Sequence, residues 1–171
     1  DAAWDGVWYA SDVYEGAENG IDLSFATGIV IDPFGGNDTL MGIESVYATD
    51  FDDTLAGSAG NDVFVPLGGN DTINAGGGYD ILYGDAGDTA YRGIELIFST
   101  TVEGDGEIEV DSSGDRDTFT GIESASGTEV ADILLGGAGR QDIYDGDGAD
   151  IIDGGADVDT LDIGGRGAVY L

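Results

Sequence analysis

Apolar and polar positions alternate in a nine-residue pattern over much of this chain. Each unit has a Gly-rich first half, followed by three residues of β-forming character whose middle member is apolar. In a strand the middle side chain points to one face and its neighbours to the other, so the middle position is the predicted core. The residues at this position are Leu55, Phe64, Ile73, Leu82, Leu134, Ile143, Ile152 and Leu161. A fixed period of this kind predicts short turn–strand units stacked into a solenoid.

The units form two blocks, residues 48–83 and 127–162, and a weaker unit, GDAGDTAYR, follows the first block. A longer repeat contains both blocks, because residues 35–60 match residues 114–139 at a constant offset of 79. The two matching segments share a DTxxGIES motif, for which we expect a structural role, with Glu44 and Glu123 as local hydrogen-bond acceptors. We therefore predict four regions: 1–34 as an N-terminal cap or the first strands leading into the roll, 35–92 as the first repeat block, 93–113 as connecting strands, and 114–171 as the second repeat block.

The segments outside the blocks are expected to close the solenoid. A solenoid unit buries its core only against its neighbours, so the ends require caps. Residues 94–113 alternate with period two, which is typical of longer strands. The aromatic side chains near the N-terminus favour the core of a cap over a carbohydrate platform: Trp4, Trp8, Tyr9 and Tyr14. The 32 Gly residues argue against any long helix.

An acid ends the turn of almost every unit. The sixth position is Asp in seven of the eight units, namely Asp53, Asp62, Asp71, Asp80, Asp132, Asp150 and Asp159. The exception has Gln141 in this position and Asp142 one residue later. The chain has 36 acids against 4 Arg and no Lys, a net charge of -32, and 27 of the acids are Asp. Such a charge opposes a compact state, and bound cations are the simplest remedy. A salt-adapted surface and a metal-free solenoid with solvated turn acids are the alternatives.

Composition also excludes several functions. A chain this acidic has no surface for nucleic acid or anionic membranes, and no apolar run is long enough to cross a bilayer. There is no Cys, so no disulfide holds the fold. His and Lys are absent as well, which removes the usual general bases and activators of nucleophiles. We expect no enzyme activity in this chain, with a two-carboxylate glycosidase as the remaining enzymatic alternative.

The nine-residue unit resembles the GGxGxDxUx repeat of the RTX (hemolysin-type calcium-binding) family. AGGGYDILY and GSAGNDVFV are close matches, and the resemblance covers residues 35–92 and 114–162. It implies an all-β fold, a parallel β-roll (a right-handed β-solenoid) with two units per coil and capping strands. Units 18 residues apart then stack, which pairs Asp53 with Asp71, Asp62 with Asp80, Asp132 with Asp150, and Asp159 with the turn of Gln141.

The resemblance also implies Ca²⁺ between stacked turns, bound by the seven sixth-position Asp. Carbonyl ligands are expected from Gly60, Gly69, Gly78, Gly139 and Gly148, with Gly76, Gly137 and Gly155 as second-position candidates. Calcium takes six to eight hard oxygen ligands in flexible geometry, and roughly four to six such ions are expected. Zinc is disfavoured without His or Cys, and magnesium by its stricter octahedron. Arg140 is expected to replace an ion in the exceptional turn.

The predicted function is a calcium-binding module of a secreted or cell-surface bacterial protein. Its role is structural, and it folds when calcium binds; the resemblance adds type I secretion. Alternatives are the repeat region of a surface adhesin or S-layer-like protein, and an accessory module of a secreted polysaccharide-acting or proteolytic enzyme. Ice binding is disfavoured, because the third turn position shows no ladder of Thr and Asn. A cell-surface or polysaccharide partner remains open.

Overall fold

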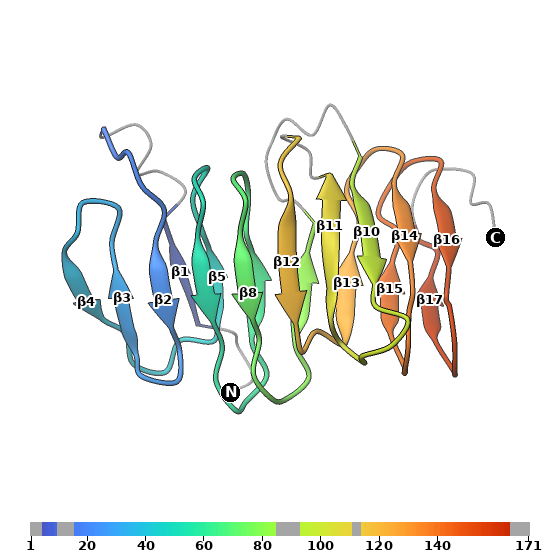
Figure 1. Ribbon diagram of the computed structural model, residues 1–171, viewed down its shortest axis with the longest axis horizontal. Coiled ribbons are helices and arrows are strands. Elements are labelled where there is room, and N and C mark those ends of the chain that lie inside the picture. The colour runs from blue at the N-terminus through green and yellow to red at the C-terminus, as the bar shows by residue number, and fades with distance from the viewer. Residues whose placement is uncertain (1–4, 10–15, 85–92, 111–113, 165–171) are drawn as a thin grey trace.

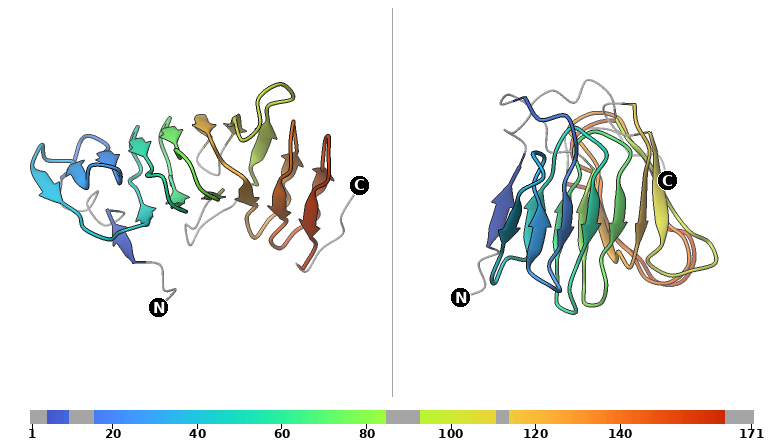
Figure 2. Two further views of the ribbon diagram at one scale, coloured as in Figure 1. Left: turned by 90° about the horizontal axis from the view of Figure 1, so that it is seen from below. Right: turned by 60° about the vertical axis from the view of Figure 1, so that its left-hand side comes forward.

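Two β-sheets face each other over most of the length of the molecule (Figures 1 and 2). The computed structural model describes residues 5–9, 16–84, 93–110 and 114–164. These residues form 17 short strands and no helix, so none of the described residues belongs to a helix that could span a membrane. The prediction of an all-β fold of stacked parallel strands, a β-roll, is confirmed.

The seven-stranded sheet is parallel throughout and runs through both repeat blocks. Its order is β1 (Gly6–Trp8), β5 (Ser45–Tyr47), β7 (Val63–Val65), β9 (Ile81–Tyr83), β13 (Ser124–Ser126), β15 (Asp142–Tyr144) and β17 (Thr160–Asp162). The blocks join where β9 pairs with β13. Each of these strands has three residues, and most are followed by a turn that contains Gly.

The ten-stranded sheet contains two antiparallel meanders in addition to the repeat strands. Its order is β16 (Ile151–Asp153), β14 (Ile133–Leu135), β10 (Glu95–Phe98), β11 (Gly106–Val110), β12 (Asp117–Thr120), β8 (Thr72–Asn74), β6 (Thr54–Ala56), β2 (Asp22–Ser24), β3 (Ile29–Ile31) and β4 (Asn37–Thr39). One meander, β2–β3–β4, ends the sheet. The other, β10–β11–β12, lies between the two blocks.

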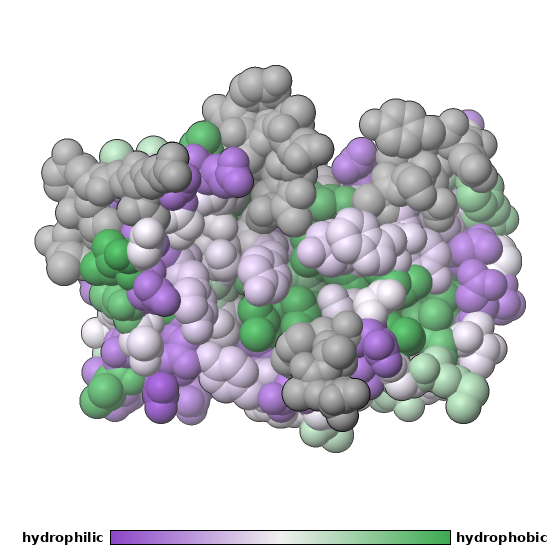
Figure 3. All heavy atoms as spheres, turned by 180° about the vertical axis from the view of Figure 1, so that it is seen from behind, coloured by the Kyte–Doolittle hydropathy of each residue, from purple (hydrophilic) through white to green (hydrophobic). Residues whose placement is uncertain are grey.

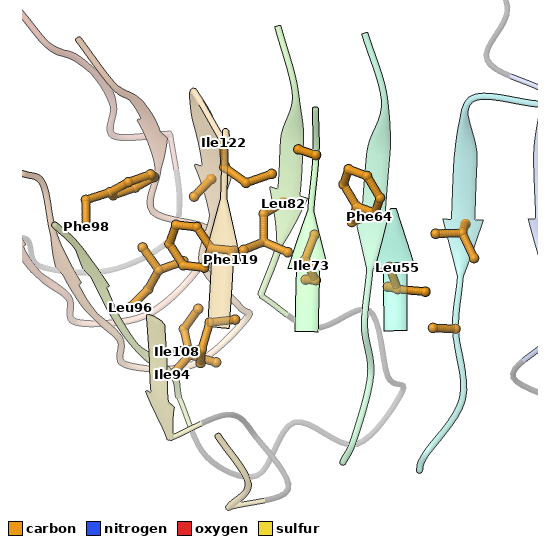
Figure 4. Close-up of a cluster of buried hydrophobic side chains, with 14 of the residues drawn as sticks. Leu55, Phe64, Ile73, Leu82, Ile94, Leu96, Phe98, Ile108, Phe119 and Ile122 are labelled. Carbon is orange, nitrogen blue, oxygen red and sulfur yellow. The ribbon is translucent and has the colours of Figure 1, made fainter. Parts of the chain in front are cut away.

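The core lies between the sheets and consists mainly of the middle residues of the strands, with residues such as Ile94 and Ile122 from just outside them (Figure 4). The parallel register places the middle residue of each strand beside the middle residue of its neighbour, for example Leu55 beside Ile73 and Phe64 beside Leu82. At most 1% of each of these four side chains is exposed, and burying one fully contributes about 1.5–3 kcal/mol. Seven of the eight predicted core positions are buried, and Leu161 in the last strand is partly buried.

The N-terminal aromatic residues divide between the core and the surface. Tyr9 is buried, as expected of a cap. Trp8 is 64% exposed and stacks on Tyr47 of the neighbouring strand, with ring centroids 3.7 Å apart. Its assignment to the core was therefore wrong, because Trp8 holds the outward position of β1. Apolar and weakly polar residues gather along the middle of the outer face of the seven-stranded sheet, to which β1 belongs (Figure 3). Trp4, Tyr14 and residues 85–92 of the weaker unit lie outside the described residues.

Candidate metal centre

The turns stack so closely that Gly is required in them. A Cβ at Gly76 would lie 2.1 Å from the Ser58 carbonyl oxygen, and one at Gly78 would lie 2.4 Å from the Gly60 carbonyl oxygen. Gly78 also has a φ of 141°, which other residues rarely adopt. The predicted ligand glycines with positive φ are Gly69, Gly76, Gly78, Gly139, Gly148 and Gly155, whereas Gly60 and Gly137 do not have it. The backbone oxygens of one turn therefore lie against the backbone of the next.

The sixth-position acids form ladders along the turns. In each predicted pair, the backbone N–H of one residue donates to a carboxylate oxygen of the residue stacked on it. The bonds run from Asp53 to Asp71 (2.7 Å), Asp62 to Asp80 (2.8 Å), Asp132 to Asp150 (2.9 Å) and Gln141 to Asp159 (3.0 Å). The structure thus brings together all four pairs that the 18-residue spacing predicts.

Two further acids extend the ladders across the junction between the blocks. The Asp71 N–H donates to Asp117 Oδ1 at 2.8 Å, and the Asp80 N–H donates to Glu123 Oε2 at 2.9 Å. Glu123 is thus a hydrogen-bond acceptor, as expected, but its donor is 43 residues away rather than local. Asp117 was not assigned to the ladder, since it lies 46 residues from Asp71 rather than 18. The sequence feature that could have identified Asp117 is the DTxxGIES motif, which places an acid at the start of a strand.

The oxygen ligands that the turns offer are suited to a calcium ion. Asp62 Oδ1 and Asp80 Oδ2 are buried carboxylate oxygens without a hydrogen-bond partner, on side chains that are 0% exposed. Among the described residues, no three acidic side chains form a group that could hold an ion by themselves, so an ion in the turns would need further oxygen ligands, such as the backbone carbonyls of the Gly-rich turns. Carboxylate and carbonyl oxygens are the ligands that calcium prefers. A bound ion would supply the positive charge that these carboxylates lack.

Burial makes the charged form of these carboxylates unfavourable. Desolvation raises the pKa of Asp53 to about 6 and that of Asp80 to about 6. It also raises the pKa of Asp62, Asp132 and Asp150. Hydrogen bonds from backbone N–H groups oppose this effect at each site without overcoming it. A cation at the turns would reverse the effect, because a nearby positive charge favours the ionised form.

In the exceptional turn, the side-chain amide of Gln141 forms hydrogen bonds with the backbone of the turn. Gln141 is 0% exposed, accepts a hydrogen bond from the Gly137 N–H (3.2 Å) and donates one to the Ala138 carbonyl (2.7 Å). The Arg140 guanidinium contacts Asp142 Oδ1 at 3.3 Å and Thr160 Oγ1 at 3.4 Å. Arg140 therefore pairs with the acid that follows Gln141, and its role as a replacement for an ion stays a prediction.

The fold and the ladders define a calcium-binding β-roll. A family model described as the RTX calcium-binding nonapeptide repeat matches the chain in four copies, over residues 41–73, 66–88 and 126–162, and the chain belongs to this family. The matched residues include all seven sixth-position Asp and leave out Asp117, Glu123 and the β10–β11 hairpin. No curated protein matches the chain in a sequence search.

Proposed function

We propose that this calcium-binding module is a folding switch in a secreted or cell-surface protein, with a structural rather than catalytic role. The observation that carries the proposal is the ladder of buried carboxylates, in which Asp62 Oδ1 and Asp80 Oδ2 have no hydrogen-bond partner. A ladder of this kind destabilises the roll when it is charged and bare. The same ladder stabilises the roll when cations occupy the turns.

The strands are too short to hold the roll without help. Each repeat strand places one side chain in the core, while its turn orders six more residues at roughly 1–2 kcal/mol of backbone entropy each. Calcium that binds only the folded chain adds its binding free energy to the folding free energy. At a tenfold excess over Kd this amounts to about 1.4 kcal/mol for each site, so several sites together can decide whether the chain folds.

The calcium affinity expected for such sites suits a switch between compartments. Extracellular calcium modules typically have Kd values of ~10⁻⁴–10⁻³ M. In this proposal the chain stays unfolded at the low calcium concentration inside a cell and folds outside, where calcium is millimolar. Export in an unfolded state by type I secretion follows from the family resemblance. The net charge of -32 supports the proposal, because it keeps the calcium-free chain expanded.

Far-ultraviolet circular dichroism in EGTA, followed by titration with Ca²⁺, tests this function. We expect a disordered spectrum in chelator and a cooperative gain of β-structure with calcium. Mg²⁺ at the same concentration, and NaCl at the same ionic strength, are the controls for screening of charge. A β spectrum that persists in EGTA, or an equal gain with Mg²⁺ or NaCl, would contradict the proposal and favour a metal-free or salt-adapted roll.

A further inference from the structure

The junction between the two repeat blocks is a complete interface within the chain. In the ten-stranded sheet, β12 pairs with β8 in parallel, and Thr118 lies beside Thr72. In the seven-stranded sheet, β13 pairs with β9. The hydrogen bonds from Asp71 to Asp117 and from Asp80 to Glu123 lie beside these strand pairs. The junction therefore shows how the end of one repeat block accepts the beginning of the next.

Both halves of this interface occur a second time, at opposite ends of the roll. The 79-residue offset places β8 on β16 and β9 on β17, residue for residue. It also places β13 on β5, and β12 overlaps β4. Strands β4 and β16 are the two edges of the ten-stranded sheet, and each has one neighbour among the described strands. The molecule thus carries the two surfaces of the junction again, one at each end (Figure 1).

The outer edge of β4 has backbone N–H groups that could pair with a parallel strand. The Leu40 N–H donates to the Gly28 carbonyl, on the side of β3. Since N–H groups alternate in direction along a strand, those of Thr39 and Met41 point away from β3. Leu40 in this edge segment is only partly buried, whereas Phe119, its counterpart at the internal junction, is 1% exposed. An unpaired edge of this kind is a template for another strand.

Strand β1 occupies the other half of this surface. It pairs with β5 in the register that β9 has on β13: Val7 lies beside Val46 as Leu82 lies beside Ala125. The backbone bonds match too, because the Glu44 and Ser45 N–H groups donate to the Asp5 carbonyl, as those of Glu123 and Ser124 donate to the Asp80 carbonyl. β1 is therefore a short substitute for the strand that a preceding block would supply.

We propose that the folded roll binds a second copy of itself head to tail, with β16 and β17 of one copy docked on β4 and β5 of the next. The internal register predicts Ile151 beside Thr39 and Ile152 beside Leu40 across the interface. Because β1 and the incoming β17 require the same place on β5, β1 must leave first. Strand β1 therefore competes with the incoming β17 and limits assembly. The interaction rests on the proposed calcium-dependent fold, since it needs the folded roll. At the interface the Asp150 N–H would donate to the Asp38 carboxylate, as the Asp71 N–H donates to the Asp117 carboxylate.

Paired cysteines provide a direct test, because the natural chain contains no Cys. A disulfide requires Cα atoms about 4.4–6.8 Å apart, which laterally adjacent residues on neighbouring strands satisfy. The variant Thr39→Cys with Ile151→Cys is oxidised in calcium at increasing protein concentration and run on non-reducing gels. We expect dimers and longer ladders. Adding Val7→Asp should increase their yield severalfold, since it weakens the packing of β1 on the core.

Two matched pairs separate failure of assembly from failure of the fold. Thr72→Cys with Thr118→Cys has the same register inside one chain, so it should form an intramolecular disulfide whenever the roll is folded. Thr39→Cys with Val102→Cys is out of register and reports random collisions. If the first control closes while the Thr39/Ile151 pair stays monomeric, or forms ladders no faster than the out-of-register pair, the inference is overturned. If the first control does not close in calcium, the register on which the inference rests is itself wrong.

Discussion

Neutralising one buried acid of the ladder should have opposite effects on the folded chain with and without calcium. Asp80→Asn is the most informative change. Its Oδ1 position still accepts the Asp62 N–H, which is 2.8 Å away. The amide nitrogen then replaces Oδ2, the oxygen without a partner. The substitution therefore preserves the shape and the hydrogen bond of the side chain while it removes one buried charge.

The size of the effect follows from the electrostatics of Asp80. Desolvation raises the pKa of this carboxyl from 3.8 to about 6. That difference corresponds to about 3 kcal/mol against the charged form, and after screening by solvent at the turn roughly 1–2 kcal/mol remains. The calcium-free folded state of Asp80→Asn should become more stable by up to this amount. In calcium the variant loses a ligand, and the midpoint of the calcium titration should rise about tenfold, equivalent to about 1.4 kcal/mol.

The assay is urea denaturation followed by circular dichroism, in EGTA with enough osmolyte to populate the fold and in saturating calcium. Asp153→Asn is the control, because it removes the same charge from an exposed position on β16. The control should leave the calcium midpoint nearly unchanged. If Asp80→Asn and Asp153→Asn shift the calcium midpoint equally, the sixth-position acids act only through net charge, and the assignment of Asp80 to a metal site is wrong.

Three further predictions address pH, the turns and the core. In EGTA the roll should be most stable below about pH 4 and lose stability as the pH rises through 6, because the pKa of Asp53 is raised to about 6 in the folded chain; a circular dichroism titration that shows no acid-induced gain of β-structure would contradict this. Gly78→Ala should raise the calcium midpoint severalfold, since its Cβ would lie 2.4 Å from the Gly60 oxygen, whereas Gly77→Ala meets open space; equal effects on the calcium titration would refute the role given to the stacked carbonyls. Phe64→Ala should destabilise the calcium-loaded roll by about 3–5 kcal/mol in urea denaturation, and a loss near that of the exposed control Val102→Ala would show that Phe64 is not a core residue.

The sequence by itself determined the repeating part of this protein. The nine-residue period assigned Phe64 and Ile73 to the core, and the 18-residue spacing assigned Asp62 and Asp80 to one ladder. These predictions succeeded because a unit and its neighbour one coil away are related by a fixed number of residues. Hydrophobic alternation and the conformational preferences of Gly then decide the local structure without reference to the rest of the chain.

Only the tertiary structure decided how the two blocks join. Asp117 and Glu123 enter the ladders from 46 and 43 residues away, and the antiparallel strand β11 is inserted between β10 and β12. Trp8 was likewise placed outside the core by the pairing of β1 with β5. No period relates these contacts, because they depend on where a connecting segment of irregular length returns the chain to the sheet edge, and many return paths suit the same local pattern.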